Sequence, residues 1–256
     1  MAEIEVLPDL ERLTETAAVY VARLASEAIA GNGVFSIALS GGTTPRPLYS
    51  LLASERFAKS IGWSQVHVFW GDERCVPPDH PESNYRMARE ALLDSLPLPP
   101  ANIHRIRGED DPKQAASSYE QELKVFLGIN PVDGSPRTGL DLVLLGMGEN
   151  GHTASLFADS SAVTERLRWV MAQYVEAVST WRITLTPIVV NAAKNIIFLV
   201  SGIEKAQRLH EVLEGPVRPE ALPAQIIKPK RGRLIWLTDR AAASCLKNVR
   251  EARSSG

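Results

Sequence analysis

Short, continuously apolar segments alternate along this chain with longer segments of helical periodicity, and this alternation is what most constrains the fold. The apolar segments occupy residues 34–39, 66–70, 141–145, 195–200 and 233–237, and a further strand is expected at 169–178. Strands that are apolar on both faces are typical of a parallel sheet covered by helices on both sides. The sequence therefore predicts an α/β fold, a three-layer α/β/α sandwich with a mostly parallel, Rossmann-like sheet.

Helix signals occupy the segments between these strands. Asp9 can cap a first helix that ends near Gly31, and Pro45 suits the first position of a second helix. Ser83 and Asp111 are caps for two more, and helices are expected to fill the remaining gaps. About thirty residues are thus expected to precede the first strand as a single helix.

No long linker, internal repeat or low-complexity segment divides the chain, so residues 1–256 are predicted to form one domain. The Pro- and Gly-rich stretch 128–139 is expected to be a surface loop, and the tail after Arg250 to be loose. Hydrophobic residues make up 45% of the chain and charged residues 23%, which is enough apolar material for a substantial core.

Charge and cysteine content restrict the partners and the compartment. A net charge of -2 provides no overall basic field for nucleic acid or an anionic membrane, although a local cationic pocket remains open. Cys75 and Cys245 are too few for a disulfide scaffold, and the N-terminus lacks an apolar signal core, so we predict a cytoplasmic protein. The apolar runs are far shorter than a membrane span. Oligomeric state is not predicted.

Loops rich in glycine or polar residues follow three of the predicted strands, and ligands of open α/β sheets bind outside the carboxyl ends of the strands. In the first loop, Gly41 and Gly42 let the backbone approach a ligand, while Thr43 and Thr44 add hydroxyl donors. The helix N-terminus that follows can cradle a phosphate. A tight strand–helix turn with a threonine cap explains the same residues equally well.

The second loop, residues 71–74, places two carboxylates beside an arginine. Asp72 and Glu73 can bind a polyol, and the planar fork of Arg74 suits phosphate. A solvated charged turn is the competing interpretation, and the position of the loop at a strand end weakens it.

The third loop, residues 146–157, contains His152 after a glycine-dense turn, where the imidazole can serve as a general base. Gly146, Gly148 and Gly151 also match the dinucleotide fingerprint G-x-G-x-x-G. Asp159 and the two serines after it would interrupt the helix that this fingerprint requires, so nucleotide binding is disfavoured.

Together these motifs resemble those of the 6-phosphogluconolactonase family. The matching segments are residues 39–45, 71–74, 83–85, 148–157, 182–186, 191–193, 201–206 and 223–224, in the order of the family and spanning about Val34 to Leu237. Two positions depart from the pattern: Ala158 stands where the family often has Pro, and Asn150 where it often has Asp. Asn150 cannot supply a negative charge to orient His152.

The resemblance implies an α/β/α fold related to glucosamine-6-phosphate deaminases. It also implies hydrolysis of 6-phospho-D-glucono-1,5-lactone to 6-phosphogluconate in the pentose phosphate pathway, with a small-molecule substrate and no cofactor. We expect His152 to take a proton from water, and Asp72 to orient His152 or bind a sugar hydroxyl. The expected substrate-binding residues are Gly41, Gly42, Thr43, Thr44, Arg74, Asn150, Arg182 and Lys205. No metal site is expected, because no spacing of ligand residues matches one.

Two other functions remain open. A glucosamine-6-phosphate deaminase would share the fold and the phosphate site, but the segment 153–157 lacks the additional acidic residue of that family. A non-catalytic sugar-phosphate sensor would need a DNA-binding module, and the residues before the first predicted strand are too few and too acidic for one.

Overall fold

The structure is a computed structural model that describes residues 2–128 and 139–247. Most of the predicted loop at 128–139 and the whole tail after Arg250 lie outside the described residues. Among the described helices, none combines the length and the apolar character needed to cross a bilayer.

A six-stranded parallel sheet forms the centre of the molecule, with strand order β1-β9-β8-β5-β2-β3. Its strands are β1 (Glu3–Leu7), β2 (Phe35–Leu39), β3 (Val66–Trp70), β5 (Leu142–Gly146), β8 (Asn195–Val200) and β9 (Arg233–Asp239). A second, antiparallel sheet has the order β4-β7-β6. Its strands are β4 (Asp72–Arg74), β6 (Val170–Val175) and β7 (Thr180–Leu185).

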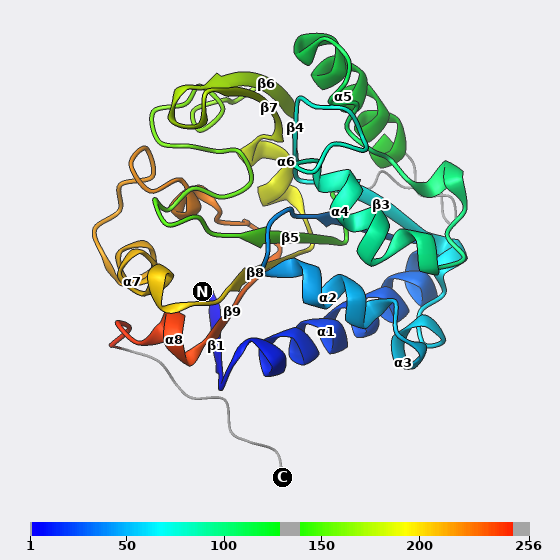
Figure 1. Cartoon of the computed structure of the whole chain (residues 1–256), viewed down its shortest axis with the longest axis horizontal. Helices are drawn as coiled ribbons and strands as arrows, with labels where there is room; N and C mark the ends of the chain where they lie inside the picture. The colour runs from blue at the N-terminus through cyan, green and yellow to red at the C-terminus, as the bar shows by residue number, and fades with distance from the viewer. Residues whose placement is uncertain (1, 129–138, 248–256) are drawn as a thin grey trace.

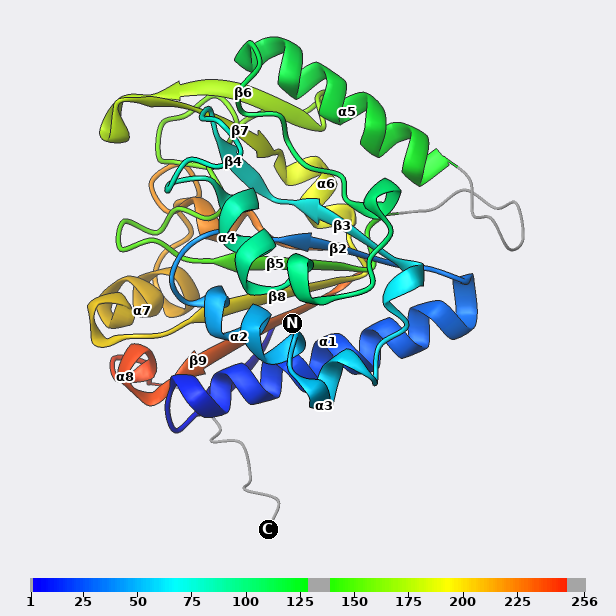
Figure 2. The same cartoon turned by 45° about the vertical axis from the view of Figure 1, so that its right-hand side comes forward.

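Helices flank the large sheet, which confirms the predicted α/β fold. They are α1 (Leu10–Asn32), α2 (Pro45–Leu52), α3 (Glu55–Ala58), α4 (Asn84–Ala91), α5 (Pro112–Gly128), α6 (Pro187–Ala192), α7 (Ala206–Glu214) and α8 (Arg240–Ala243). Helices α1, α2 and α4 lie together on one side of the large sheet (Figures 1 and 2). The small sheet and α5 lie together beyond β3, and α5 packs on β6 and β7.

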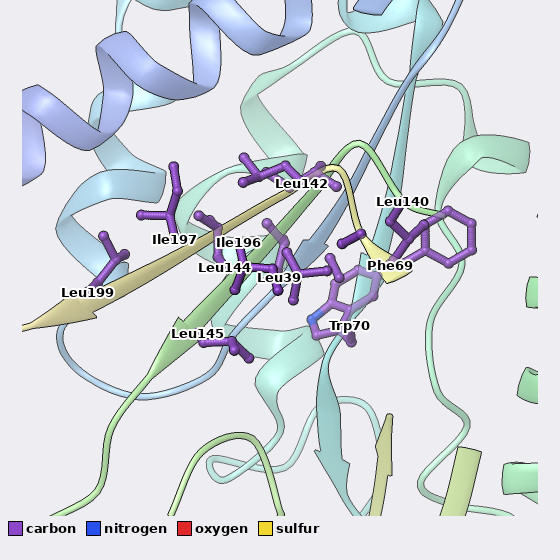
Figure 3. Packing of buried hydrophobic residues seen from close by; sticks show 14 of the residues in the cluster. Leu39, Phe69, Trp70, Leu140, Leu142, Leu144, Leu145, Ile196, Ile197 and Leu199 are labelled. Atoms are coloured by element: carbon purple, nitrogen blue, oxygen red, sulfur yellow. The ribbon is translucent and has the colours of Figure 1, made fainter. Parts of the chain in front are cut away.

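The central strands are apolar along their whole length because both of their faces are covered. Side chains of β2, β5 and β8 pack against one another and against Trp70 of β3 (Figure 3). Leu144 and Ile197 are fully buried, and so is Phe198, which stacks on Trp236 with ring centroids 3.7 Å apart. This buried core holds the carboxyl ends of the strands in fixed relative positions.

The order in which successive strands are added to the sheet reverses between β2 and β5. From β2 the chain moves outward to β3, and it then returns to the other side of β2 to form β5. The loops after β2 and β5 therefore leave in opposite directions, and a ligand-binding crevice is expected at their carboxyl ends.

Two expectations about the N-terminal and central segments were wrong. Residues 3–7 do not belong to the first helix but form β1, which pairs in parallel with β9 at the edge of the sheet. The segment 72–74 is not a free loop but strand β4, which pairs with β7. Both short strands form only because a strand distant in sequence pairs with them. Their own residues do not show the apolar pattern that predicts a strand.

Candidate active site

Four segments at the carboxyl ends of the large sheet line one cavity of about 490 Å³. They are the loop after β2, the start of β4, the loop after β5 and the segment that follows β8. Eight of the predicted site residues line it: Gly41, Gly42, Thr43, Thr44, Asp72, Arg74, His152 and Lys205. The volume falls in the range typical of small-molecule sites.

The loop after β2 is held by buried partners, which leaves its polar groups available. The Tyr49 hydroxyl accepts from the Ser40 N–H at 3.0 Å and donates to the Ser40 carbonyl at 2.8 Å. Thr44 occupies the N-cap position of α2, yet its side chain makes no capping hydrogen bond. The threonine-cap interpretation of this loop is therefore wrong, and the hydroxyl remains available for a ligand.

Gly41 is required by a close approach of the chain. A Cβ built on Gly41 would lie 1.8 Å from Oδ1 of Asn84, so no larger residue fits without moving Asn84. Gly42 has φ +98°, a left-handed conformation that favours glycine. These glycines bring the backbone of the loop against α4 and the cavity.

Asp72 is buried, with 8% of its surface exposed, and it is held by two side chains. Ser155 Oγ donates to one carboxylate oxygen at 2.6 Å, and Asn84 Nδ2 donates to the other at 3.2 Å. Asn84 Nδ2 also donates to the Asp72 carbonyl at 2.9 Å. The carboxylate is thus fixed at the wall of the cavity, and the partners found for it among the described residues do not include His152.

Glu73 does not share the cavity with Asp72, contrary to the expected pair of sugar-binding carboxylates. Its carboxylate accepts from the backbone N–H groups of Arg74, Asn84 and Tyr85 at 2.7–2.8 Å and from the Ser83 hydroxyl at 3.1 Å. Burial raises the pKa of Glu73, and these backbone donors partly offset that rise. Glu73 therefore ties β4 to the start of α4 and positions its neighbours.

His152 lies at the cavity on a tightly bent loop. The Gly148 N–H donates to the His152 carbonyl at 2.9 Å, and the ring stacks on Phe157 with centroids 4.2 Å apart. Asn150 Oδ1 accepts from the His152 backbone N–H at 3.2 Å and also contacts ring atom Nδ1. Asn150 itself is not among the residues that line the cavity.

The electrostatic surroundings of His152 favour the neutral imidazole. Burial lowers the pKa of His152 most, the positive charges of Lys205, Arg182 and Arg74 lower it further, and Asp72 opposes them. A neutral histidine near pH 7 can accept a proton, which is what a general base requires.

The cations near His152 are incompletely neutralised. Arg182 is the cross-strand partner of Arg74 and is only 9% exposed. Burial lowers the pKa of Arg182 most, and the positive charge of Arg74 lowers it further. Within the described residues neither guanidinium has a carboxylate at ion-pair distance. Arg74 instead donates to the Glu82 carbonyl, and Lys205 Nζ lies 3.4 Å from Glu149. Such a cluster suits a doubly charged anion.

Other chemistries lack their structural requirements in the described part of the chain. The loop after Gly151 is not followed by a helix, so the dinucleotide fingerprint has no helix N-terminus for a pyrophosphate. Within residues 2–128 and 139–247, no three His, Cys, Asp or Glu side chains lie close enough together to hold a metal ion. Metal-free catalysis stays a prediction.

Sequence reasoning missed three residues that shape the site. Ser155 and Asn84 anchor Asp72, and Glu149 contacts Lys205, which lines the same cavity. Ser155 and Asn84 lie inside the quoted motifs, but only the fold brings them to a carboxylate 83 and 12 positions away.

Comparison with known proteins agrees with this geometry. Residues 8–236 match the family model described as glucosamine-6-phosphate isomerases/6-phosphogluconolactonase. A 6-phosphogluconolactonase of Synechocystis sp. is 42% identical over 246 residues, which are 96% of this chain and 98% of that protein. A probable chloroplastic 6-phosphogluconolactonase of Oryza sativa subsp. indica is 39% identical, over 93% of this chain and 74% of that one.

A solved structure supports the same assignment. The 6-phosphogluconolactonase from Trypanosoma cruzi has a TM-score of 0.84 and 31% identity, and the match covers 97% of this chain and 98% of that one. Sequence and fold agree over nearly the whole length of the chain. The chain therefore belongs to the 6-phosphogluconolactonase family, within the wider family of glucosamine-6-phosphate isomerases and 6-phosphogluconolactonases.

Proposed function

We propose that this chain hydrolyses 6-phospho-D-glucono-1,5-lactone to 6-phospho-D-gluconate in the oxidative pentose phosphate pathway, with His152 as the general base. The observation that carries this assignment is a histidine at the wall of a cavity that also holds under-neutralised cations, where burial lowers the pKa of that histidine. A base beside an anion site suits an ester substrate with a phosphate at its far end.

Asn150 sets the tautomer of His152. Its Oδ1 atom accepts the backbone N–H of His152, so this atom is the amide oxygen, and ring atom Nδ1 must donate its proton to it. Nε2 then carries the lone pair. Asn150 is therefore a positioning residue that acts as a neutral acceptor where the family often has a carboxylate.

The reaction follows from this arrangement in two steps. Nε2 of His152 takes a proton from water as the water oxygen bonds to the lactone carbonyl carbon. The tetrahedral intermediate collapses by breaking the bond to the ring oxygen, which takes the proton back from the imidazolium. Backbone N–H groups of the glycine loops stabilise the oxyanion, and Asp72, fixed by Ser155 and Asn84, accepts a hydrogen bond from a sugar hydroxyl.

The phosphate is held by the loop after β2 and by the cations that line the same cavity. Gly41, Gly42, Thr43 and Thr44 offer backbone and hydroxyl donors, and Arg74 and Lys205 offer charge. Arg182 does not line the cavity, so it acts through Arg74, its cross-strand neighbour.

The activity test follows disappearance of 6-phosphogluconolactone generated in place, with the uncatalysed rate subtracted. We expect hydrolysis far above background and no ammonia release from glucosamine 6-phosphate. Ammonia release without lactone hydrolysis would instead assign a deaminase. Saturable binding of the sugar phosphate without turnover would assign a sensor.

The acidic limb of kcat/KM is expected to have its midpoint below the ordinary histidine value of about 6.5, because burial and three cations lower the pKa of His152. Activity rises with pH as the base loses its proton. Asn150→Asp adds a negative charge beside Nδ1 and should move the midpoint upward. Asp72→Asn removes the opposing negative charge and should move it downward.

The substrate phosphate titrates in the same range, but it is common to all three proteins. Differences between their profiles therefore report the enzyme. Equal midpoints in all three proteins would mean that the acidic limb of kcat/KM does not report the titration of His152.

Glu149→Gln is expected to lower KM by about two- to fivefold without changing kcat, because Glu149 competes with the phosphate for Lys205. Steady-state kinetics at fixed ionic strength measure the change. Glu55→Gln is the matched control, because it removes the carboxylate that pairs with exposed Lys59, away from the cavity. A raised KM in Glu149→Gln would show that Glu149 supports substrate binding instead.

We also place the protein in the cytoplasm with a small-molecule partner, and without nucleic-acid or membrane partners. Cys75 and Cys245 are both free thiols, and burial raises the pKa of Cys75 to about 11, so that this thiol stays protonated. Fractionation of the native host with a cytosolic marker tests the location.

A further inference from the structure

A second cavity of about 790 Å³ lies at the opposite edge of the large sheet. It is bounded by α6, by the residues just before β8 and by the segment 226–232 that leads into β9. These are the amino ends of the strands, whereas the candidate active site lies at their carboxyl ends. Since β8 has six residues, the two sites are separated by about 20 Å of strand.

The lining of this cavity concentrates positive charge in a chain whose net charge is -2. Five cations line it, namely Arg166, Lys194, Lys228, Lys230 and Arg231, against the single carboxylate of Glu165. Glu165 already accepts the backbone N–H groups of Arg166, Leu167 and Arg168 at 2.7–3.2 Å. The Glu165 carboxylate is therefore already hydrogen-bonded within its own turn.

Most of these cations have no carboxylate partner. Lys194 pairs with buried Asp141 at 2.8 Å. In the described portion of the chain, Lys228, Lys230 and Arg231 form no ion pair, and Arg166 donates to backbone carbonyls only. The excess charge would be neutralised by an anion bound from solution.

The same cavity has an apolar floor and a fixed wall. Pro187, Ile188 and Ile226 contribute apolar surface. Asn191 of α6 donates to the Ile226 carbonyl at 3.0 Å and accepts from the Lys228 N–H at 2.6 Å. This pair of hydrogen bonds ties the backbone at the start of the basic segment to the floor, so that part of the main chain is positioned before a ligand arrives.

We propose that this cavity binds an organic phosphate of nucleotide size, with the phosphates on the basic rim and a flat apolar group on the floor. Five cations that line one cavity, two of them arginines, favour a multiply charged phosphate over a single carboxylate. The volume lies within the range of small-molecule sites.

The test is calorimetric titration of the whole protein with ADP, in the presence of saturating 6-phosphogluconate to occupy the candidate active site. We expect saturable binding at one site per chain. Lys228→Glu/Lys230→Glu should weaken ADP binding by about tenfold or more, equivalent to about 1.4 kcal/mol. The control Lys59→Glu/Lys113→Glu makes the same change in net charge at exposed positions outside this cavity and should bind ADP as before.

Pyrophosphate and adenosine separate the contributions of rim and floor. ADP binding tighter than either fragment supports the proposal. Pyrophosphate binding as tight as ADP would reduce the cavity to an unspecific anion site and overturn it. Absence of saturable ADP binding, or equal weakening in the control variant, would overturn it as well. Lactone hydrolysis by both double variants verifies that they are folded.

Discussion

His152→Ala is expected to lower kcat for lactone hydrolysis by about 10²–10⁴-fold, because the variant loses the general base while the rest of the cavity is retained. KM should change little, since the phosphate contacts come from other loops. Single-turnover measurements after subtraction of the spontaneous reaction give the chemical step directly.

His210→Ala is the matched control, because His210 belongs to α7, pairs with Glu214 and does not line the cavity. It should keep kcat, and a thermal melt of each variant shows whether the fold survives. Unchanged kcat in folded His152→Ala would remove His152 from its role and transfer the base function to another group at the cavity.

Gly148→Ala is expected to lower kcat by about 10²-fold, the cost of misplacing a reacting group by about an ångström. A Cβ on Gly148 would lie 2.1 Å from Cε1 and 2.2 Å from Nδ1 of His152, so the imidazole must leave its position between Asn150 and Phe157. The same kinetic assay measures this loss without removing any functional group.

Gly31→Ala provides the matched control, because nothing lies within 4 Å of a Cβ built there and Gly31 lies in α1, outside the cavity lining. It should keep kcat close to that of the unsubstituted protein. Equal losses in the two variants would mean that the loss does not come from the contact between a Gly148 Cβ and His152, and the proposed role of Gly148 would be wrong.

Much of the fold can be predicted from the sequence, because hydrophobic periodicity is a local property. Strands β2, β3, β5 and β8 were expected within one residue of their observed bounds, since a strand covered on both faces is apolar throughout. The caps Asp9 and Ser83 were also confirmed, each accepting the backbone N–H three residues on. A buried strand and a capped helix start can each be recognised from a few consecutive residues.

Strands β1 and β4 were missed for the converse reason. Each is short and partly polar, and each becomes a strand only when β9 or β7 supplies its hydrogen bonds. The small antiparallel sheet matters for function because it aligns Arg74 with Arg182. No local pattern encodes that pairing.

The candidate site divides in the same way. The sequence by itself determined which loops follow the carboxyl ends of the predicted strands, and it placed His152, Asp72 and Arg74 in those loops. This was possible because each motif comes directly after an apolar strand in the sequence, and ligands of such sheets bind at the strand ends. Only the tertiary structure separated Asp72 from Glu73, turning the first toward the cavity and the second onto the α4 N-terminus. Adjacent residues of a strand face opposite sides, and which side is the cavity depends on contacts made far along the chain.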